Sequence, residues 1–487
     1  MKHSSVFNYS AAWLCLAVLL HVGLGLSMEL SVDEAHYVLY AKHMAWSYFD
    51  PPPLVGWAQW PLVQLTSTAG LIRLLPEALW LLSLALVYQN TQALHAWMSS
   101  GAAVSRLALP SPQVSGCLAV TAISLALLPH LLAISLLPDT LLTTLSLGLM
   151  LLSLRWVNRQ EFNRWHWLLL GLLLGLAGLS KYTAVFAALA VSLVFAASDR
   201  KIPFDSVWPW MAIALAMVLV SPVFYWNAVN DWISFKYQLA HGKGDEWQSR
   251  KLLAFGLVQT ICFGPLMIYG AGVCVKRYKT YASPVLIALL CFFLLPFGVF
   301  AVMSGSGGLP HWTTPAWYCL APFAGLGLAS AWEKPRSWTI QILGALQAAL
   351  FSAGVVVVCL GFVPFTQLKP NPFADVYGWE KAGMRAKELV NMHGADGMAV
   401  KNWSLASRAA WYAYPVTVYV IDNHHDQFEL WFGRPRPGQR VVYVRWSELA
   451  GDDQEAGFES CEPLESLQTI RFDQALSRFD FSLCRFK

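Results

Sequence analysis

Charged side chains are scarce in this chain. Asp, Glu, Lys and Arg together make up 13% of its 487 residues, whereas soluble domains contain about 25%. Hydrophobic residues reach 56%, which is more apolar surface than one water-soluble core could bury. The composition therefore excludes a water-soluble globular enzyme, and it excludes an intrinsically disordered chain as well.

Signatures of nucleic-acid binding and of cysteine chemistry are also missing. The net charge is only +4 and the cations are scattered, which argues against a nucleic-acid partner. None of the nine cysteines forms a C-x-x-C pair, and most lie in apolar runs as small hydrophobic residues. Only Cys461 and Cys484 share the polar C-terminal segment. The sequence leaves open whether these two cysteines form a disulfide, which would require an extracytoplasmic location.

Long apolar runs dominate the first three quarters of the sequence. A membrane-spanning helix needs about 20 mostly apolar residues, and we expect about eleven such spans in a polytopic α-helical membrane protein. They lie at about 11–28, 76–97, 113–133, 138–155, 165–180, 182–198, 207–227, 252–274, 283–303, 314–332 and 338–364. The predicted transmembrane domain covers residues 1–369 and includes a first outer loop at 29–75.

The remaining residues, 370–487, have the pattern of a small soluble α/β domain. We expect helices over Tyr377–His393 and Ser404–Ala413, and strands over Met398–Lys401, Thr417–Ile421 and Arg440–Trp446. No catalytic motif is visible there. The pattern favours a domain that caps the membrane part or docks an acceptor.

The distribution of Lys and Arg predicts the orientation in the membrane. With the N-terminus inside, the short cytoplasmic segments hold twelve of these residues and the longer opposite loops hold seven. This bias follows the positive-inside rule. Eleven spans then place the C-terminal domain outside, and we expect a multi-pass protein of the bacterial cytoplasmic (inner) membrane that faces the periplasm.

Acidic residues are rare before residue 370 and gather on one predicted side. Of thirteen, four fall in cytoplasmic loops, Glu77 lies at the outer start of the second span, and the rest fall outside. The outer residues are Glu29, Asp33, Glu34, Asp50, Asp139, Asp231, Asp245 and Glu246. A charged active site is therefore expected on the outer face.

The first outer loop is the most informative of these segments. Asp33, Tyr37, Tyr40 and Met44 would share one face of a helix lying at the bilayer surface, which the prolines after Asp50 would end. Ser31-x-x-Glu34 is a capping box, which explains Glu34 by local structure alone. Asp33 in the first turn also complements the helix dipole, although local structure explains it less well than Glu34. The dipole would keep Asp33 ionised, as a base or metal ligand requires.

Three more polar residues interrupt apolar surroundings at the outer side. Asp139 follows Pro138 at the start of the fourth span, Lys181 breaks the run between the fifth and sixth, and His311 precedes the tenth. Ionisable groups near the membrane are costly and often functional. The structural alternatives are an N-cap for Asp139, snorkelling for Lys181 and an aromatic-belt position for His311.

These motifs together resemble the GT-C glycosyltransferases. The sequence is most similar to the protein O-mannosyltransferase-like group (family 39), which includes bacterial transferases that add aminoarabinose to lipid A. The matching motifs are Asp33-Glu34, Tyr48-Phe-Asp-Pro-Pro-Pro-Leu54, Leu137-Pro-Asp-Thr140, Gly178-Leu-Ser-Lys-Tyr182, Trp226-Asn-Ala-Val-Asn-Asp-Trp232 and Leu309-Pro-His-Trp312. They cover essentially the whole membrane part.

The resemblance implies an inverting transfer of a sugar from a polyprenyl-phosphate donor on the outer face of the membrane. It implies that Asp33 is the base that activates the acceptor, that Glu34 orients it, and that Asp139 is the second acid. The aminoarabinose transferases carry an acid–lysine pair in the first loop, but Asp50 is followed here by Pro51. This departure argues against lipid A aminoarabinose activity and leaves phosphate binding to other cations.

The residues also fit this chemistry without the resemblance. A polyprenyl phosphate leaves well if its charge is met, and Lys181, His311 and Arg73 are the available outer cations. Tyr37, Asp50, Asn227 and Asp231 are further candidates for the donor pocket, although Asn227 and Asp231 could equally form a helix end. No His/Cys cluster indicates a cofactor, and a divalent metal held by Asp33 or Asp139 stays open.

Two other functions remain as alternatives. A transporter or flippase of lipid-linked sugars would show paired repeats, and none is visible. A polysaccharide ligase or polymerase would be expected to rely on arginines in a large outer loop. We therefore predict a membrane glycosyltransferase whose partners are the bilayer, a lipid-linked sugar and an envelope glycolipid, polysaccharide or protein acceptor.

Overall fold

The structure is a computed structural model that describes most of the chain. Residue 1 and residues 101–108, 242–246, 279–282, 334–337, 361–370, 372 and 450–456 lie outside the described residues, as do the side chains of 2–6 and 241. Asp245 and Glu246 of the predicted outer acids belong to this undescribed part, and so does the predicted domain boundary at residues 369 and 370. The described residues form two compact units.

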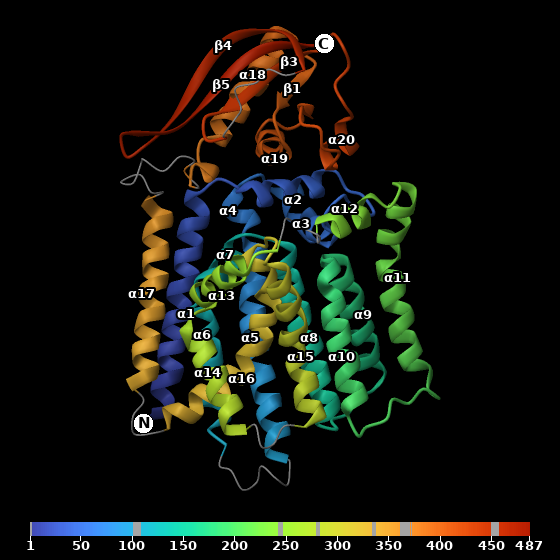
Figure 1. Cartoon of the computed structure of the whole chain (residues 1–487), viewed down its shortest axis with the longest axis vertical. Coiled ribbons are helices and arrows are strands. Elements are labelled where there is room, and N and C mark those ends of the chain that lie inside the picture. Colours follow the sequence, from blue (N-terminus) through green and yellow to red (C-terminus); the bar gives the residue numbers. More distant parts are fainter. Residues whose placement is uncertain are drawn as a thin grey trace. The chain divides into compact units, whose positions relative to one another are not determined.

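Unit 1 consists of Met1–His21, Pro51–Val55 and Arg73–Ala353. It is a bundle whose longer helices run side by side, as Figure 1 shows. Its helices are α1 (Lys2–Ser27), α5 (Leu74–Ser100), α6 (Pro112–Ser124), α7 (Leu127–Ile134), α8 (Pro138–Val157), α9 (Arg164–Ser180), α10 (Val185–Ala197), α11 (Val207–Val229), α12 (Ile233–His241), α13 (Ser249–Phe263), α14 (Pro265–Tyr278), α15 (Pro284–Met303), α16 (Thr314–Trp332) and α17 (Trp338–Leu360). The ends of α1 and α17 beyond His21 and Ala353 are assigned to unit 2.

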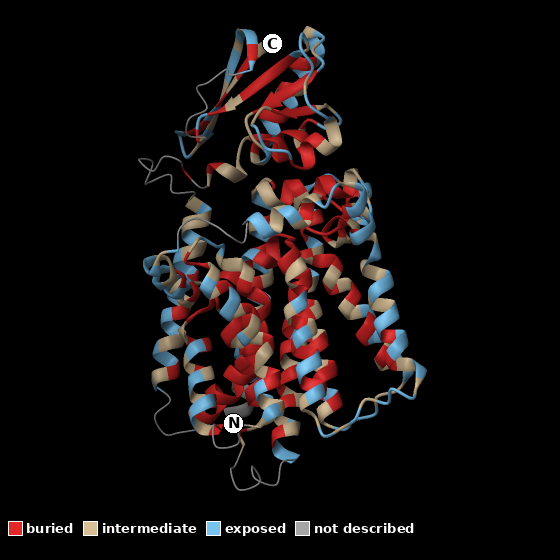
Figure 2. Ribbon diagram, turned by 45° about the vertical axis from the view of Figure 1, so that its right-hand side comes forward, coloured by how far each residue is buried: buried red, intermediate tan, exposed pale blue. Residues whose placement is uncertain are grey.

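Helix α16 is the buried centre of unit 1. Every residue from Thr314 to Ala331 is buried, and Figure 2 shows buried helices in the middle of the bundle with exposed faces at its periphery. Two glycines let neighbouring helices approach, because a Cβ on Gly325 would lie 2.4 Å from the Ser115 carbonyl oxygen of α6 and one on Gly327 would lie 1.9 Å from that of Gly270 in α14. Small residues at such crossings are typical of helix packing in membranes.

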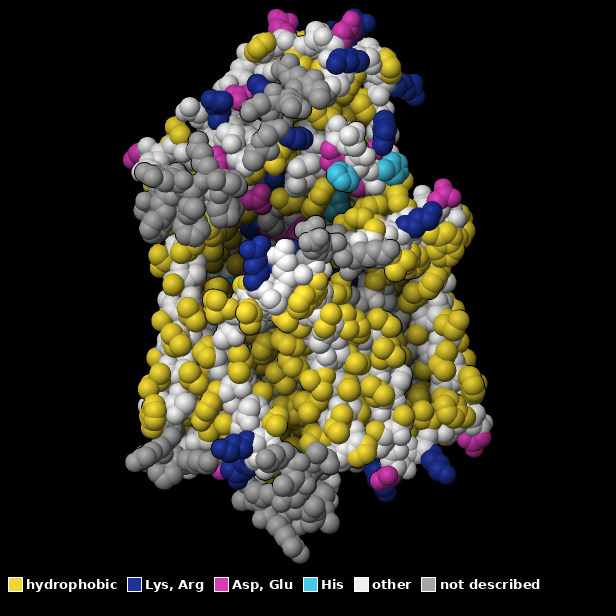
Figure 3. All heavy atoms as spheres, viewed as in Figure 1, with side chains coloured by type: hydrophobic (Ala, Val, Ile, Leu, Met, Phe, Trp, Pro, Cys, Tyr) yellow, Lys and Arg dark blue, Asp and Glu magenta, His cyan; other side chains and the backbone are white. Residues whose placement is uncertain are grey.

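The surface of unit 1 fits a lipid environment. In Figure 3, hydrophobic side chains cover the visible face of the helices and hardly any charged side chain lies among them. Within the described part of the chain, six helices are long and apolar enough to cross a membrane, and there are up to eight spans if the bent pairs α6–α7 and α13–α14 each count as one. All eleven predicted segments contain helix, but α9, α10 and α16 do not pass this test of length and composition.

Unit 2 joins the first loop to the C-terminal part of the chain. It consists of Val22–Asp50, Gly56–Ile72 and Gly354–Lys487. Its elements are α2 (Val32–Lys42), α3 (Leu54–Leu65, from Gly56 on), α4 (Ala69–Ile72), α18 (Trp379–His393), β1 (Gly397–Val400), α19 (Trp403–Tyr412), β2 (Val418–Val420), α20 (Gln427–Phe432), β3 (Arg440–Trp446), β4 (Phe458–Arg471) and β5 (Gln474–Phe486). Helix α2 ends at Lys42, earlier than the predicted end at the prolines, because the chain turns at His43.

The five strands form one mixed sheet in the order β2-β1-β3-β5-β4. Strand β1 pairs in parallel with β2 and β3, whereas β3–β5 and β5–β4 are antiparallel. Strands β1, β2 and β3 and helices α18 and α19 lie at the predicted segments, while α20 and the β4–β5 hairpin were not predicted. A disulfide joins Cys461 of β4 to Cys484 of β5, which face each other across the hairpin.

The first loop and the C-terminal segment exchange helix caps. The Glu29 carboxylate accepts the backbone N–H groups of Gly378, Trp379 and Glu380 at the start of α18, at 2.6 to 3.2 Å. In return, Asp375 accepts the N–H of Val32 at the start of α2, at 3.4 Å. Free N–H groups at a helix start need acceptors, and a carboxylate there also meets the positive end of the helix dipole. Each segment therefore completes a helix of the other.

An ion pair with a buried arginine supports this exchange from the C-terminal side. The Arg408 guanidinium is 1% exposed and is paired with Asp375, and it stacks 3.9 Å from the centroid of the Trp379 ring. Burial raises the pKa of Glu29 and of Asp375 and lowers that of Arg408 to about 10. Arg408 therefore stays charged at neutral pH, and Asp375 keeps a counter-charge.

Replacing Glu29 by Ala should destabilise unit 2 by about 1–3 kcal/mol, because three backbone N–H groups lose their acceptor. The free energy of unfolding of the full-length protein in detergent checks this, with the exposed Glu462→Ala as matched control. Equal stability of the Glu29→Ala and Glu462→Ala variants would show that water replaces this cap without cost.

Candidate active site

Three predicted polar residues meet in unit 1. The Lys181 ammonium donates to both carboxylate oxygens of Asp139, each at 2.8 Å, and Nε2 of His311 lies 3.9 Å from Oδ2 of Asp139. The Asp139 side chain is 2% exposed, and the Lys181 and His311 side chains are 18% and 16% exposed. The structure thus brings together an acid and two bases from three separate segments.

Local breaks in the helices place these three side chains. Pro138 starts α8, which puts Asp139 in its first turn. Helix α9 ends at Ser180, and Lys181 is extended before the short 3-10 turn Tyr182–Ala184. His311 lies in a second 3-10 turn, Pro310–Thr313, which leads into α16. Each residue therefore stands where a helix starts or stops.

The charges of the cluster balance among its own members. Asp139 compensates Lys181, which also lies 5.7 Å from the centroid of the Trp312 ring. Burial lowers the pKa of His311, and the nearby Lys181 lowers it further, whereas Asp139 raises it. His311 is therefore neutral at pH 7. Capping of Asp139 and snorkelling of Lys181 do not by themselves explain why these two side chains form a pair.

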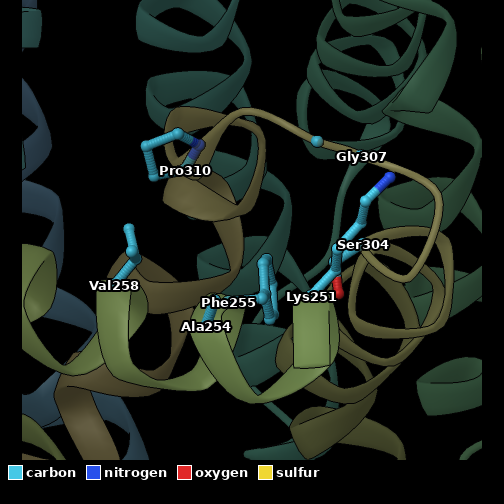
Figure 4. A pocket seen from close by; sticks show the side chains of 8 residues that line it. Lys251, Ala254, Phe255, Val258, Ser304, Gly307 and Pro310 are labelled. Atoms are coloured by element: carbon cyan, nitrogen blue, oxygen red, sulfur yellow. The ribbon is translucent and has the colours of Figure 1, made fainter. Parts of the chain in front are cut away.

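A pocket opens beside this cluster in the same unit. It has a volume of about 280 Å³ and is lined by Lys251, Ala254, Phe255, Val258, Ser304, Gly307, Gly308 and Pro310, the residue before His311. Figure 4 shows Lys251 and Ser304 at one end of the pocket and Val258 and Pro310 at the other. A cation at one end of an apolar trough suits a ligand with an anionic head and a hydrocarbon chain. Lys251 is not among the site residues predicted from the sequence.

The predicted residues of the first loop lie in unit 2. Asp33 is half-buried in the first turn of α2, and Tyr37 is half-buried one turn later. The buried Glu34 carboxylate accepts the Ser31 N–H at 3.1 Å and its hydroxyl at 3.0 Å, so its capping interaction is observed. Asp50 is half-buried, and its carbonyl oxygen accepts the Tyr40 hydroxyl at 2.7 Å. The proposed roles of Asp33 and Glu34 in chemistry stay predictions.

Three further predicted residues belong to unit 1. Arg73 is 5% exposed just before α5. Asn227 is fully buried, and its side chain donates to the Val223 carbonyl at 3.0 Å and accepts the Ser234 N–H at 3.2 Å. Asp231 is exposed with a φ of +54°. Asn227 therefore holds the turn after α11, which is the helix-end alternative.

A second buried polar cluster, not predicted from the sequence, lies in unit 1. Nδ1 of His21 lies 2.7 Å from Oε2 of Glu77, and Nε2 of His21 lies 2.7 Å from Nδ1 of His130. All three residues are buried. They are 56 and 109 positions apart in the sequence, so no local motif could reveal them. Among the described residues, no group of three His, Cys, Asp or Glu side chains could hold a metal ion.

Comparisons with known proteins agree with the predicted resemblance. The model of the dolichyl-phosphate-mannose-protein mannosyltransferase family matches residues 50–226. ArnT from Cupriavidus metallidurans is similar in the apo state, with a TM-score of 0.61, 15% identity and 98% of each chain covered. Its structure bound to undecaprenyl phosphate gives a TM-score of 0.60 at the same identity and coverage.

A mycobacterial arabinofuranosyltransferase, AftD, is also similar, with a TM-score of 0.53 and 12% identity over 98% of this chain and 41% of that one. No curated protein matches the sequence. At these identities, the solved structures show a shared fold. The resemblance to the GT-C glycosyltransferases is confirmed, and the chain has the fold of ArnT.

Replacing Lys181 by Met should destabilise unit 1 by about 3–5 kcal/mol, because the buried Asp139 carboxylate loses its counter-charge. The double variant Asp139→Asn/Lys181→Met should recover much of this loss. Denaturant unfolding in detergent measures both, with the exposed Lys201→Met as control. A double variant as unstable as Lys181→Met would rule out the pair as the cause.

Unit 2 should become less stable as the pH is lowered, because of His36. The Ser407 hydroxyl donates to the Trp403 carbonyl, so Nδ1 of His36, 3.0 Å away, must donate to Ser407. Burial lowers the pKa of His36 from 6.5 to about 3. The unfolded chain therefore binds this proton below pH 6.5 and the folded one only near pH 3, so stability is lost as the pH falls through that window.

Between pH 7.5 and 5.0 the loss should be about 2 kcal/mol. The free energy of unfolding at the two pH values, compared with that of His36→Gln, checks it. The His36→Gln variant should lack this part of the slope; an identical slope in both proteins would assign the effect to other groups.

Proposed function

We propose that this protein is an inverting glycosyltransferase that moves a sugar from a polyprenyl-phosphate donor to an acceptor of the cell envelope. The observation that carries this proposal is the Asp139–Lys181–His311 cluster around a buried carboxylate, next to a pocket of α13 that is lined by Pro310, the residue before His311. The shared fold with ArnT, and the ArnT structure that holds undecaprenyl phosphate, support the class of donor. The acceptor is an envelope glycolipid or polysaccharide, or a protein.

The cations of unit 1 suit the leaving group of such a transfer. When the bond between the sugar C1 and the phosphate oxygen breaks, negative charge grows on the phosphate and must be stabilised. Two of the three ammonium hydrogens of Lys181 bond to Asp139, which leaves one to donate to a phosphate oxygen. Asp139 thus orients Lys181 in addition to its predicted role as an acid. Lys251, His311 and Arg73 are further cations or donors for the phosphate.

The apolar part of the pocket suits the hydrocarbon part of the donor. It is lined along α13 by Ala254, Phe255 and Val258. Lys251 lies at one end of the pocket and Pro310 at the other. A lipid phosphate has the same order of groups, an anionic head followed by an apolar chain. We assign the first isoprene units to this trough, since apolar burial there adds binding free energy that free phosphate lacks.

Asp33 is the proposed base for the acceptor. Its place in the first turn of α2 stabilises the ionised carboxylate, because the helix dipole is positive there. Asp33 takes the proton from the acceptor as the acceptor atom attacks C1 from the side opposite the phosphate. One displacement then forms the new glycosidic bond, breaks the bond to the phosphate and inverts the configuration. Tyr37, Asp50 and Asp231 are proposed to contact the sugar.

The disulfide supports an outward orientation of unit 2. Disulfides persist in oxidising compartments such as the periplasm, and Cys461–Cys484 lies in unit 2 together with Asp33. We therefore propose that the protein resides in a bacterial inner membrane with this unit on the periplasmic side. This agrees with the distribution of Lys and Arg.

Asp33→Asn should reduce transfer by a factor of about 10²–10⁴, because an amide cannot accept the acceptor's proton. The test compares deletion cells that carry the wild-type, Asp33→Asn or Asp205→Asn protein, where Asp205 is an exposed acid in a predicted cytoplasmic loop. Mass spectrometry of envelope lipids and glycans should find a sugar-type mass that only the Asp33→Asn cells lack. Undiminished product in those cells, at equal protein levels, would overturn the role of Asp33.

A further inference from the structure

Unit 2 contains a polar pocket that the proposed chemistry does not use. It has a volume of about 460 Å³ and opens where β3 ends and β5 begins, beside β4. Its lining is Arg445, Trp446, Ser447, Glu448, Leu449, Gln468, Ala475, Leu476, Ser477, Arg478 and Asp480. The volume falls within the range of small-molecule sites, about 300–1,000 Å³.

The acids of this pocket already have partners. Asp480 accepts from Arg478 at 3.2 Å and from the Ser466 hydroxyl at 2.5 Å. Both oxygens of Glu448 are also used, one by the backbone N–H of Asn371 at 2.8 Å and the other by the Ser447 hydroxyl at 3.1 Å. The carboxylate oxygens named here therefore already accept hydrogen bonds, and Asp480 is also ion-paired with Arg478.

Two donors in the same lining have no partner among the described residues. Nε of Arg445 and the hydroxyl of Ser477 are buried atoms without a hydrogen bond there, and Ser477 is only 5% exposed. Leaving such groups unsatisfied is costly, so a ligand that accepts hydrogen bonds would stabilise the site. The exposed amide of Gln468 stands at the opening, opposite Arg478 in the register of the hairpin.

We propose that this pocket binds an acidic saccharide, and that it docks the acceptor glycan of the transferase. A carboxylate or phosphate oxygen on the sugar would accept from the Arg445 guanidinium, which forms strong bonds with such oxygens. Sugar hydroxyls would bond to Ser477 and Gln468, and the sugar C–H face would contact the apolar part of the lining. The docking role rests on the proposed function, whereas saccharide binding by itself does not.

Binding is measured on the full-length protein in nanodiscs by saturation-transfer NMR. Four probes separate the chemistries: glucuronate, glucose 6-phosphate, glucose and inorganic phosphate. We expect saturation transfer to glucuronate or to glucose 6-phosphate, and at least tenfold weaker binding in Arg445→Gln. Ser477→Ala should weaken binding about fivefold through one lost hydrogen bond. The exposed Arg434→Gln, outside the pocket, is the matched control and should bind as the wild type does.

Several results would overturn the proposal. One is the absence of saturation transfer to both glucuronate and glucose 6-phosphate. Another is that the Arg445→Gln and Arg434→Gln variants bind these sugars equally well. Inorganic phosphate that binds as tightly as glucose 6-phosphate would reduce the pocket to an anion site. If Arg445→Gln does not fold, the binding of the acidic sugars is measured on Arg445→Lys and Ser477→Ala instead, and both should bind more weakly than the wild type. The lysine keeps the charge of Arg445 but not its planar pair of donors.

The two proposals fail separately. The Asp33→Asn protein should still bind the acidic sugar although it transfers nothing, because the pocket does not include Asp33. Saccharide binding without any transferase product in wild-type cells would overturn the proposed function and keep the saccharide site. A transferase product without saccharide binding to the pocket would overturn the site and keep the proposed function.

Discussion

A polar group buried among apolar helices must find a partner, and this constraint shapes the interior of unit 1. Asp139 is almost completely enclosed, and its carboxylate is held by both hydrogen bonds from Lys181. Glu77 meets the same requirement through His21, which in turn contacts His130. An isolated ionised group costs several kcal/mol in such surroundings. Asp139, Lys181 and His311 meet where helices begin or end, whereas His21, Glu77 and His130 meet from within α1, α5 and α7.

The same principle links the first loop to the C-terminal segment in unit 2. Glu29 supplies the acceptors for α18, and Asp375 supplies one for α2 while it neutralises the buried Arg408. The C-terminal segment is therefore part of the structure that holds α2, the helix that carries Asp33. If Asp33 is the base, the segment without a catalytic motif acts on the chemistry by positioning that helix. A passive cover would not need to exchange helix caps with the first loop.

Much of the fold could be predicted from local patterns. The apolar runs are helical, and the segment Arg440–Trp446 is a strand with the predicted bounds. The α20 helix and the β4–β5 hairpin were missed. Strand β4 is mostly exposed and alternates poorly, so its pairing with β5 depends on the partner strand and not on its own pattern. The end of α2 at Lys42 was also missed, because tertiary contacts of Tyr40 and Tyr48, whose rings stack at 3.7 Å, hold the turn that follows.

The sequence by itself determined that the protein is apolar and helical. It identified Asp139, Lys181 and His311 as unusual, because a polar residue that interrupts apolar surroundings is visible without coordinates, and it identified Asp33 from its place in the first turn of a predicted helix. It could not determine which of these residues meet. Asp139 and Lys181 are 42 positions apart, and only packing of α8 against α9 decided that they form a pair. Packing likewise decided that Lys251 borders one pocket and that Arg445 and Ser477 line another, where Nε of Arg445 and the Ser477 hydroxyl have no partner among the described residues. Contacts between distant segments depend on how helices and strands pack, and no local spacing encodes them.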